Sequence, residues 1–310
     1  MSNTTDRAAD RPADRARAAF TRACLLDVQV RKPGNVSLVS PGHGMDAALF
    51  MASAKAAAGP LCAPGARVGP RIEAAMQATW AVAGCNTNLG ILLLCAPVAM
   101  ALERHPQATT PAALQAAIGD VLGDLDTADA EAAYRAIAQA NPGGLGNAER
   151  QDVREVPSVN LRAAMALAAD RDSIALQYRD GYAQVFETGL TALGPAFALT
   201  AESGHYQPPH SATVAAVQRT FLALLSTLPD SHIARKHGVP TAHAVMHQAQ
   251  PWHALAVQGA HLDAEPEFKA WDAALKAQGI NPGTTADLTV VSLMLAALCG
   301  PASAPKRDGP

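Results

Sequence analysis

Polar side chains that could do chemistry gather in a few glycine- and proline-rich breaks between long apolar stretches of this 310-residue chain. Charged residues make up only 16% of the chain, so the polar clusters are few enough to be weighed one by one. Five clusters stand out, and they begin at Lys32, Asn86, Asn141, Asp230 and Gly279. Because glycine lets a backbone approach a ligand closely, we expect these breaks to form the site.

The first cluster combines a cation, an amide, an imidazole and a carboxylate in one irregular segment. Its members are Lys32, Gly34, Asn35, His43 and Asp46. The lysine could pair with a phosphate as a point charge, while the histidine and the aspartate could exchange protons with a substrate. A helix C-cap followed by a turn explains the same residues equally well.

The second and third clusters are rich in amides and glycines. Asn86, Thr87 and Asn88 lie between two apolar stretches and need hydrogen-bond partners if they are buried, although Asn88 could equally cap the next helix. The run 141–146 holds three glycines. It lacks the strand before and the Gly-Lys-Ser/Thr after that define a Walker loop, so an ordinary turn explains it.

The fourth cluster is the densest and holds Asp230, His232, Arg235, Lys236 and His237 within one short break. So many donors beside an acid favour a polyphosphate-binding segment, and a solvated charged turn is the competing interpretation.

The fifth cluster opens the last apolar helix and contains Gly283, Thr284 and Asp287. The free N–H groups of a helix start favour an anion there. Asp287 could instead complement the helix dipole. Asp152 and Asp172 are further candidates as Mg²⁺ ligands, since Mg²⁺ needs only one or two carboxylates beside substrate phosphates. For Asp172, an ordinary ion pair at the surface is the competing interpretation.

Composition excludes several other classes of protein. The net charge of -3 does not fit a nucleic-acid-binding surface, and the five cysteines include no Cys-x-x-Cys pair for zinc. The N-terminus has no apolar signal region, and no apolar run is long enough to cross a membrane, so we expect a cytoplasmic protein.

Apolar residues recur at three- and four-residue steps, which predicts an all-α fold. We expect one helical catalytic domain over residues 18–300, a flexible tail over 1–17 and a disordered tail over 301–310. The predicted helices cover residues 14–30, 46–58, 69–83, 88–103, 111–139, 159–190, 211–228, 240–258, 265–278 and 285–299.

Taken together, four of these segments resemble the triphosphoribosyl-dephospho-CoA synthase family. The residues that carry the resemblance are Lys32 to Asn35, Asn86-Thr87, Asp230 to Gly238, and Pro282-Gly283 followed by Ala286-Asp287-Leu288. They occur in the family's order and at similar spacing, and the similarity extends roughly from residue 22 to 298. The family is all-helical. Its members transfer the triphosphoribosyl part of ATP to the ribose 2′-hydroxyl of 3′-dephospho-CoA and release adenine.

The resemblance implies a transferase that binds ATP with Mg²⁺ and a dephospho-CoA-like acceptor, without nucleic acid or membrane; a homodimer is left open. Under this hypothesis Asp287, Asp230 or Asp46 stabilises charge on the ribose and could take the proton from the attacking hydroxyl, and His43 or His237 assists the leaving base. The triphosphate would be held by Lys32, Arg235 and Lys236, with neutral hydrogen bonds from Asn86, Thr87, Asn88 and Thr284.

Several positions depart from the decarboxylase-linked members of the family. Asn88-Leu89-Gly90 stands where those members have His-Lys-Gly, and Thr284-Thr285 stands where they have Gly-Ser. These variants resemble a subgroup seen in methanogens and in bacteria with pterin-linked one-carbon metabolism. Two alternatives therefore stay open: a nucleotide-dependent transferase or kinase acting on a pterin-type precursor, and a non-catalytic helical interaction protein.

Overall fold

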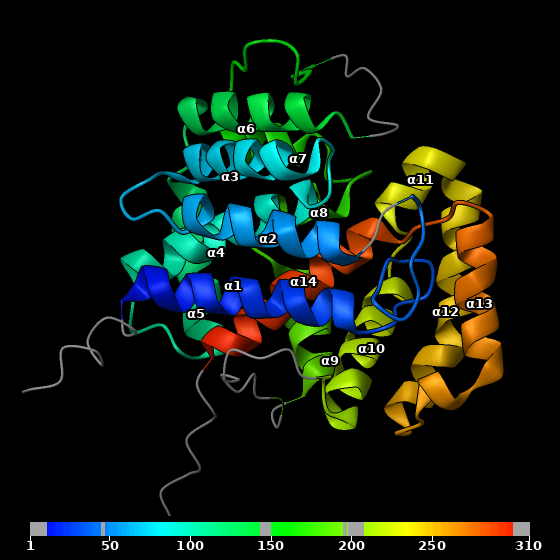
Figure 1. Ribbon diagram of the computed structural model, residues 1–310. Helices are drawn as coiled ribbons and strands as arrows, with labels where there is room; N and C mark the ends of the chain where they lie inside the picture. The colour runs from blue at the N-terminus through cyan, green and yellow to red at the C-terminus, as the bar shows by residue number, and fades with distance from the viewer. Residues whose placement is uncertain (1–10, 45–46, 143–149, 195–196, 198–207, 300–310) are drawn as a thin grey trace, which may run out of the picture.

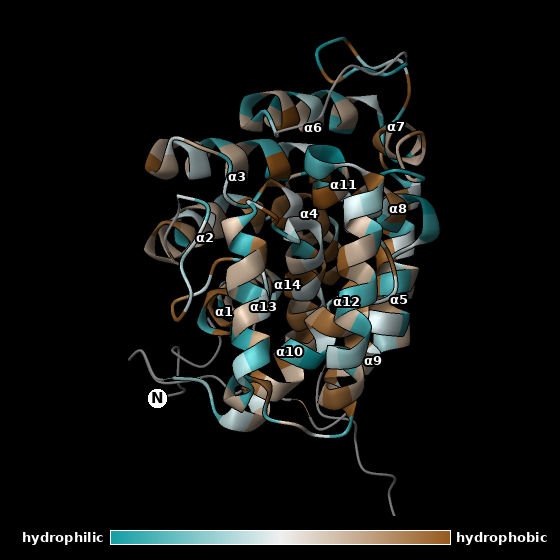
Figure 2. Ribbon diagram, turned by 90° about the vertical axis from the view of Figure 1, so that its right-hand side faces the viewer, coloured by the Kyte–Doolittle hydropathy of each residue, from teal (hydrophilic) through white to brown (hydrophobic). Residues whose placement is uncertain are grey.

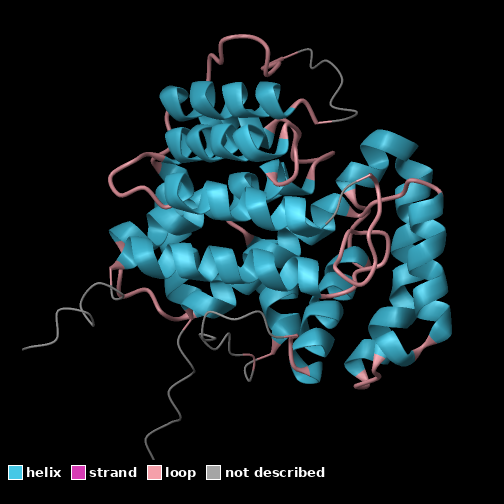
Figure 3. Ribbon diagram, viewed as in Figure 1, coloured by secondary structure: helices cyan, strands magenta, loops and turns pink. Residues whose placement is uncertain are grey.

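The computed structural model describes residues 11–44, 47–142, 150–194, 197 and 208–299. Figure 3 shows helices joined by loops and no strand in this part of the chain, which confirms the all-α prediction. The α-helices are α1 Pro12–Gln29, α2 Ala47–Leu61, α3 Val68–Ala83, α4 Leu89–Arg104, α5 Pro111–Gly123, α6 Thr127–Ala140, α7 Leu161–Ala166, α8 Ser173–Asp180, α9 Thr191–Leu193, α10 Ser211–Leu225, α11 Ser231–His237, α12 Val239–Val257, α13 Pro266–Ala277 and α14 Gly283–Leu298. A π-helical turn η1 spans Val185–Leu190, and a 3-10 turn η2 spans Leu262–Ala264.

Helix α4 lies at the centre of the main core. Every residue from Leu89 to Leu102 is buried, as expected for a helix that is apolar on all sides and enclosed by others. Helix α14 packs against α4 and also against α1, α10 and η1. Around this centre α1, α2, α3 and α6 lie one above another, each in contact with the next (Figure 1). In Figure 2, α4 and α14 are largely hydrophobic, whereas α13 carries polar stretches.

A second hydrophobic cluster joins α10, α11, α12 and α13 at one edge of the molecule (Figure 1). Trp252 of α12 meets Phe268 of α13 edge to face, with ring centroids 5.2 Å apart, and stacks on Trp271. Apart from their area burial, such aromatic pairs contribute about 1 kcal/mol each. This cluster holds α11 beside the start of α14, and the candidate site lies between the two cores.

Several of the predicted helix boundaries are wrong, and most of the errors occur where a capping residue begins a new helix. The stretches 111–139 and 159–190 are each broken, because Asp126 caps α6 through a capping box and Asp172 caps α8. The segment after Leu228 is not a turn but helix α11, capped by Asp230. Helix α1 begins at Pro12, inside the tail expected over residues 1–17, since proline is favoured in a first helical turn.

Candidate active site

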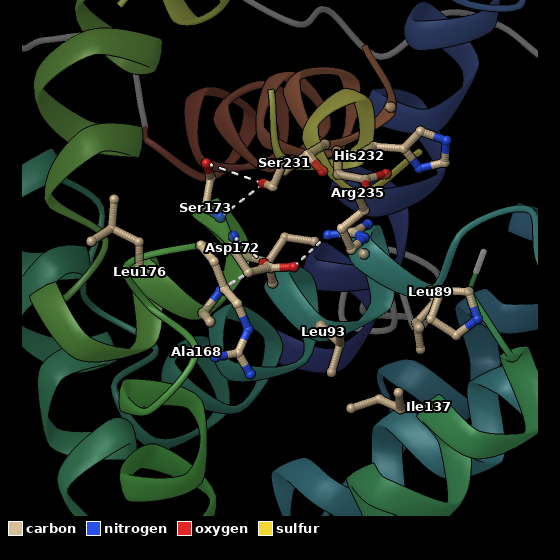
Figure 4. A pocket seen from close by; sticks show the side chains of 18 of the residues that line it. Leu89, Leu93, Ile137, Ala168, Asp172, Ser173, Leu176, Ser231, His232 and Arg235 are labelled. Atoms are coloured by element: carbon tan, nitrogen blue, oxygen red, sulfur yellow. Dashed lines mark hydrogen bonds and ion pairs between the residues drawn. The ribbon is translucent and has the colours of Figure 1, made fainter. Parts of the chain in front are cut away.

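A cavity of about 720 Å³ opens where α11 faces the starts of α4, α8 and α14. A helix start carries partial positive charge, so three of them around one space favour an anionic ligand. Both signs of charge occur in the lining, with three arginines, Arg150, Arg171 and Arg235, and five aspartates, Asp27, Asp152, Asp170, Asp172 and Asp287. Apolar side chains, among them Leu93 and Ile137, line the side opposite Asp172 and Arg235 (Figure 4).

Asp172 and Arg235 form the central ion pair of this cavity. Oδ2 of Asp172 accepts a 2.6 Å hydrogen bond from Nη1 of Arg235, while Oδ1 accepts bonds from the backbone N–H groups of Ile174 and Ala175 (Figure 4). Helix capping therefore fixes Asp172, and Asp172 in turn orients the guanidinium. The Nε of Arg235 is buried without a hydrogen-bond partner, which leaves donor capacity for a ligand.

Asp287 points into the cavity from the second turn of α14. Among the described residues, none donates a hydrogen bond to its carboxyl group. Burial and then the nearby carboxylates of Asp27 and Asp230 raise the pKa of Asp287 well above its ordinary value. Helix α4 makes room for this side chain at Gly90, where an added Cβ would overlap the carboxyl oxygen.

The amide cluster before α4 is only partly satisfied by protein. Asn88 accepts a 3.1 Å hydrogen bond from Thr79, and Asn86 accepts one from the backbone of Leu89. The hydroxyl of Thr87 and the amide nitrogen of Asn88 are buried without partners. Since buried polar groups are rarely left unpaired, these two atoms are free to bind a ligand in the cavity they line.

His232 lies beside Gly283, where even an added Cβ would meet the imidazole ring only at ordinary van der Waals distance. Burial, followed by the charges of Arg235 and Lys236, lowers the pKa of His232 to about 4. The imidazole is therefore neutral near pH 7 and can accept a proton. This histidine was noted in the densest sequence cluster but received no role there.

Asp27 was missed by sequence reasoning. It lines the cavity from α1 and forms a 3.1 Å ion pair with Lys32. The available signal was a single acid inside the run Cys24 to Val30, which is otherwise apolar except for Gln29. Burial raises the pKa of Asp27, and Lys32 opposes that shift.

Several predicted residues lie outside the cavity lining. Lys32 is fully buried behind Asp27, and His237 is exposed and faces the backbone oxygen of Gly279. The carboxylate of Asp230 accepts hydrogen bonds from the backbone of Ile233 and from the backbone and hydroxyl of Thr285. It therefore joins the start of α11 to the start of α14. The predicted base Asp46 lies outside the described residues.

The first polar loop is anchored to α13 rather than open to solvent. Asp272 accepts hydrogen bonds from the backbone N–H of Gly34 and from Ser40, and it also pairs with Arg31. Gly34 has a φ of 80°, and a side chain there would collide with Pro282. The loop thereby places Asn35 in the cavity lining, where its amide donates to Asn281 at 2.9 Å.

The other predicted residues line either this cavity or a smaller neighbouring one. Gly283 and Thr284 line the cavity at the start of α14. Asp152 also lines it, but Arg154 donates to both of its carboxylate oxygens. His43 and Lys236 line a smaller neighbouring hollow instead. Within the described part of the chain, no group of three potential ligands lies close enough to hold a metal ion by itself.

Helix starts and arginines around one cavity of an all-helical fold are features that suit a polyphosphate ligand. Comparison with known proteins gives the family: the model for ATP:dephospho-CoA triphosphoribosyl transferase matches residues 13–305. The chain belongs to this family of transferases, whose substrates are ATP and dephospho-CoA.

A crystal structure of a candidate triphosphoribosyl-dephospho-CoA synthase from Archaeoglobus fulgidus has the same fold. Its TM-score is 0.61 at 24% sequence identity, and the match covers 81% of this chain and 100% of that chain. No curated protein gives a significant match. In the described part of the chain, no helix is long and apolar enough to span a membrane. Because the family is enzymatic, a non-catalytic interaction protein is no longer an alternative.

Proposed function

We propose that the main cavity binds ATP and transfers its triphosphoribosyl group to the ribose 2′-hydroxyl of dephospho-CoA. The observation that carries this proposal is the cavity itself, with three helix starts and three arginines in the lining of one space that also has an apolar side. A triphosphate binds to helix starts and arginines, and a purine binds to an apolar surface.

The donor would lie with its phosphates toward Arg235 and the start of α14. Its adenine would lie against Leu93 and Ile137. The buried Nε of Arg235 and the buried donor of Asn88 supply hydrogen bonds that the protein does not use.

Mg²⁺ fits this site as part of the ATP complex, where it would neutralise phosphate charge. Asp172 is the carboxylate placed beside the proposed phosphates, although it is already shared between α8 and Arg235. Asp152 is engaged in the same way, because Arg154 donates to both of its carboxylate oxygens. One carboxylate beside the phosphates meets the usual needs of Mg²⁺.

In the reaction, the bond between the ribose carbon and adenine breaks, and its electron pair leaves with the base. Asp287, whose carboxyl group holds its proton to higher pH than usual, donates that proton to the departing adenine. The acceptor hydroxyl oxygen bonds to the ribose carbon, and its proton passes to the neutral His232. A carboxyl and an imidazole with pKa values displaced in opposite directions form the expected acid and base pair.

A second acceptor is favoured by the motif departures at Asn88-Leu89-Gly90 and Thr284-Thr285. Both segments line the cavity in part, so they would contact a substrate directly. They resemble the subgroup of methanogens and one-carbon metabolism, in which a pterin-type precursor could replace dephospho-CoA. The donor site is common to both proposals, and the acceptor separates them.

The test is adenine release. Purified protein is incubated with ATP, Mg²⁺ and 3′-dephospho-CoA, and free adenine and the triphosphoribosyl adduct are followed by mass spectrometry. We expect both products in equal amounts. Adenine without adduct would mean hydrolysis, whereas ATP binding without adenine would require another acceptor, to be tested with pterins.

Arg235→Met tests the phosphate contact, and Arg135→Met is its matched control. Arg135 pairs with Glu73 at the surface and lines neither cavity. The KM for ATP should rise at least 10-fold in the first variant and stay within twofold in the second. An unchanged KM in Arg235→Met would remove Arg235 from the donor site.

A further inference from the structure

A second hollow of about 370 Å³ adjoins the main cavity. It is built from the end of α3, the end of α6, the last turn of α11 and the first polar loop. The two spaces share four lining residues, which are Asn86, Pro142, His232 and Asn281. A ligand in one space therefore meets a ligand in the other at a boundary that includes His232.

The side chains that belong only to this hollow include an aromatic ring and a free cation. Trp80 lies one turn before the end of α3 and is 36% exposed, although tryptophan is usually well buried. Lys236 is exposed and has no ion-pair partner among the described residues. Its neighbour on α11, Arg235, turns into the main cavity toward Asp172, whereas the ring of His232 is turned away from Asp172 (Figure 4).

We propose that this hollow binds the adenosine 5′-diphosphate half of the acceptor dephospho-CoA, with the adenine stacked on Trp80 and the diphosphate paired with Lys236. An indole face and an ammonium group are the two features that recognise a base and a phosphate. The assignment rests on the proposed function, because it takes dephospho-CoA as the acceptor.

The position of the reacting atom supports this half of the acceptor over its pantetheine arm. The attacking hydroxyl is on the ribose between the adenine and the diphosphate, so those groups must lie within a few ångströms of the reaction. The ribose would lie at the shared boundary, where the neutral imidazole of His232 can take the hydroxyl proton. The pantetheine arm, which carries no charge, would extend away from Lys236.

The experiment measures binding and turnover separately in the full chain. Binding of 3′-dephospho-CoA and of ATP is measured by calorimetry for the native protein, Trp80→Ala, Trp80→Phe and Lys236→Ala. Trp80 and Lys236 are exposed, so these variants should fold. Val82→Ala is the matched control, because Val82 is 49% exposed on the same helix and lines neither space.

We expect Trp80→Ala to weaken dephospho-CoA binding about 10-fold or more, as for the loss of one base-stacking contact, and Trp80→Phe to recover most of it. Lys236→Ala should weaken the same binding several-fold and reduce its salt dependence. ATP binding should stay within twofold in every variant. The proposal is overturned if dephospho-CoA binding is unchanged in Trp80→Ala and Lys236→Ala, or if ATP binding falls equally.

Turnover distinguishes failure of this proposal from failure of the proposed function. Adenine release with a normal KM for dephospho-CoA in Trp80→Ala would remove the acceptor from the hollow and leave the reaction intact. Binding that depends on Trp80, without adenine release by the native protein, would support the acceptor site and overturn the proposed reaction.

Discussion

The Nζ atom of Lys32 lies 3.1 Å from Oδ1 of Asp27, and this ion pair is buried directly behind the cavity. Lys32 is fully buried and also donates to the backbone oxygens of Asp27 and Val30. A lysine that the sequence suggested for phosphate binding therefore fixes a carboxylate at the cavity wall instead. The pair links the end of α1 to the loop that follows it.

Breaking this pair should destabilise the fold strongly. Lys32→Met leaves the buried Asp27 unpaired, and such losses cost about 3–5 kcal/mol. Urea denaturation measures the change. Lys55→Met, which removes an exposed lysine on α2, should change stability by less than about 0.5 kcal/mol.

The double variant Asp27→Asn with Lys32→Met separates charge from packing. Removing both charges should recover part of the stability lost in Lys32→Met, because no buried charge is then left unpaired. If the double variant is no more stable than the single one, the lost stability comes from packing and not from the ion pair.

Asp287→Asn should nearly abolish adenine release and still increase stability at neutral pH. Loss of a general acid typically costs about 10²–10⁴ in rate. The raised pKa means that the folded state binds this proton more tightly than the unfolded state, whose pKa is about 3.9. The free energy of unfolding of the native protein therefore falls by about 1.4 kcal/mol per pH unit relative to that of the variant, as pH rises from about 4 toward the raised pKa of Asp287.

Thermal denaturation between pH 4 and 8 checks this slope. Glu131→Gln, which removes an exposed carboxylate on α6, is the control and should show no such divergence. Near-normal turnover in Asp287→Asn would exclude the carboxyl group from proton transfer. Identical pH profiles of stability for the native protein and Asp287→Asn would show that folding does not raise the pKa of Asp287.

His232→Gln should lower turnover at pH 7 by about 10²–10⁴, because the proposed proton acceptor is lost. Its effect on stability has the opposite pH dependence to that of Asp287. The pKa of about 4 lies below the unfolded value near 6.5, so the unfolded state takes up the proton first. Native stability should then fall by roughly 3 kcal/mol relative to the variant as pH drops from 6.5 to 4.

The control for His232 is His247→Gln, which changes an exposed histidine on α12 outside both cavities. It should leave turnover unchanged and follow the native stability profile. A His232→Gln variant with native turnover would assign the proton transfer to another group.

Gly90→Ala should reduce activity with the helix still formed. The new Cβ would overlap the carboxyl oxygen of Asp287, so this side chain must move away from its place in the cavity. Gly119→Ala is the matched control within α5, where no atom lies within 4 Å of the added Cβ. The control should gain about 0.4–1 kcal/mol of stability, as measured by urea denaturation. Full adenine release by Gly90→Ala would show that the position of Asp287 does not limit the reaction.

The sequence by itself determined the helical architecture. Apolar residues at helical spacing predicted most helices, and the unbroken apolar run in α4 predicted a central, enclosed position. The polar segments around Asn86, Arg235 and Asp287 could also be selected without the structure, because few other polar groups interrupt the apolar chain. Helix α11 could not, since seven residues carry too little periodicity to distinguish a helix from a charged turn.

Only the tertiary structure decided which of these polar groups face the cavity. An aspartate before an apolar run can cap its own helix or bind a ligand, and the sequence is the same in both cases. The oxygens of Asp230 accept hydrogen bonds from protein groups because α11 packs against the start of α14. The carboxyl group of Asp287 lies beside Gly90 and accepts no hydrogen bond from the described residues. Packing of distant helices also brought Asp27 to the cavity and buried Lys32 beside it. The chemistry of each side chain is local, but its freedom to act depends on what the fold places opposite it.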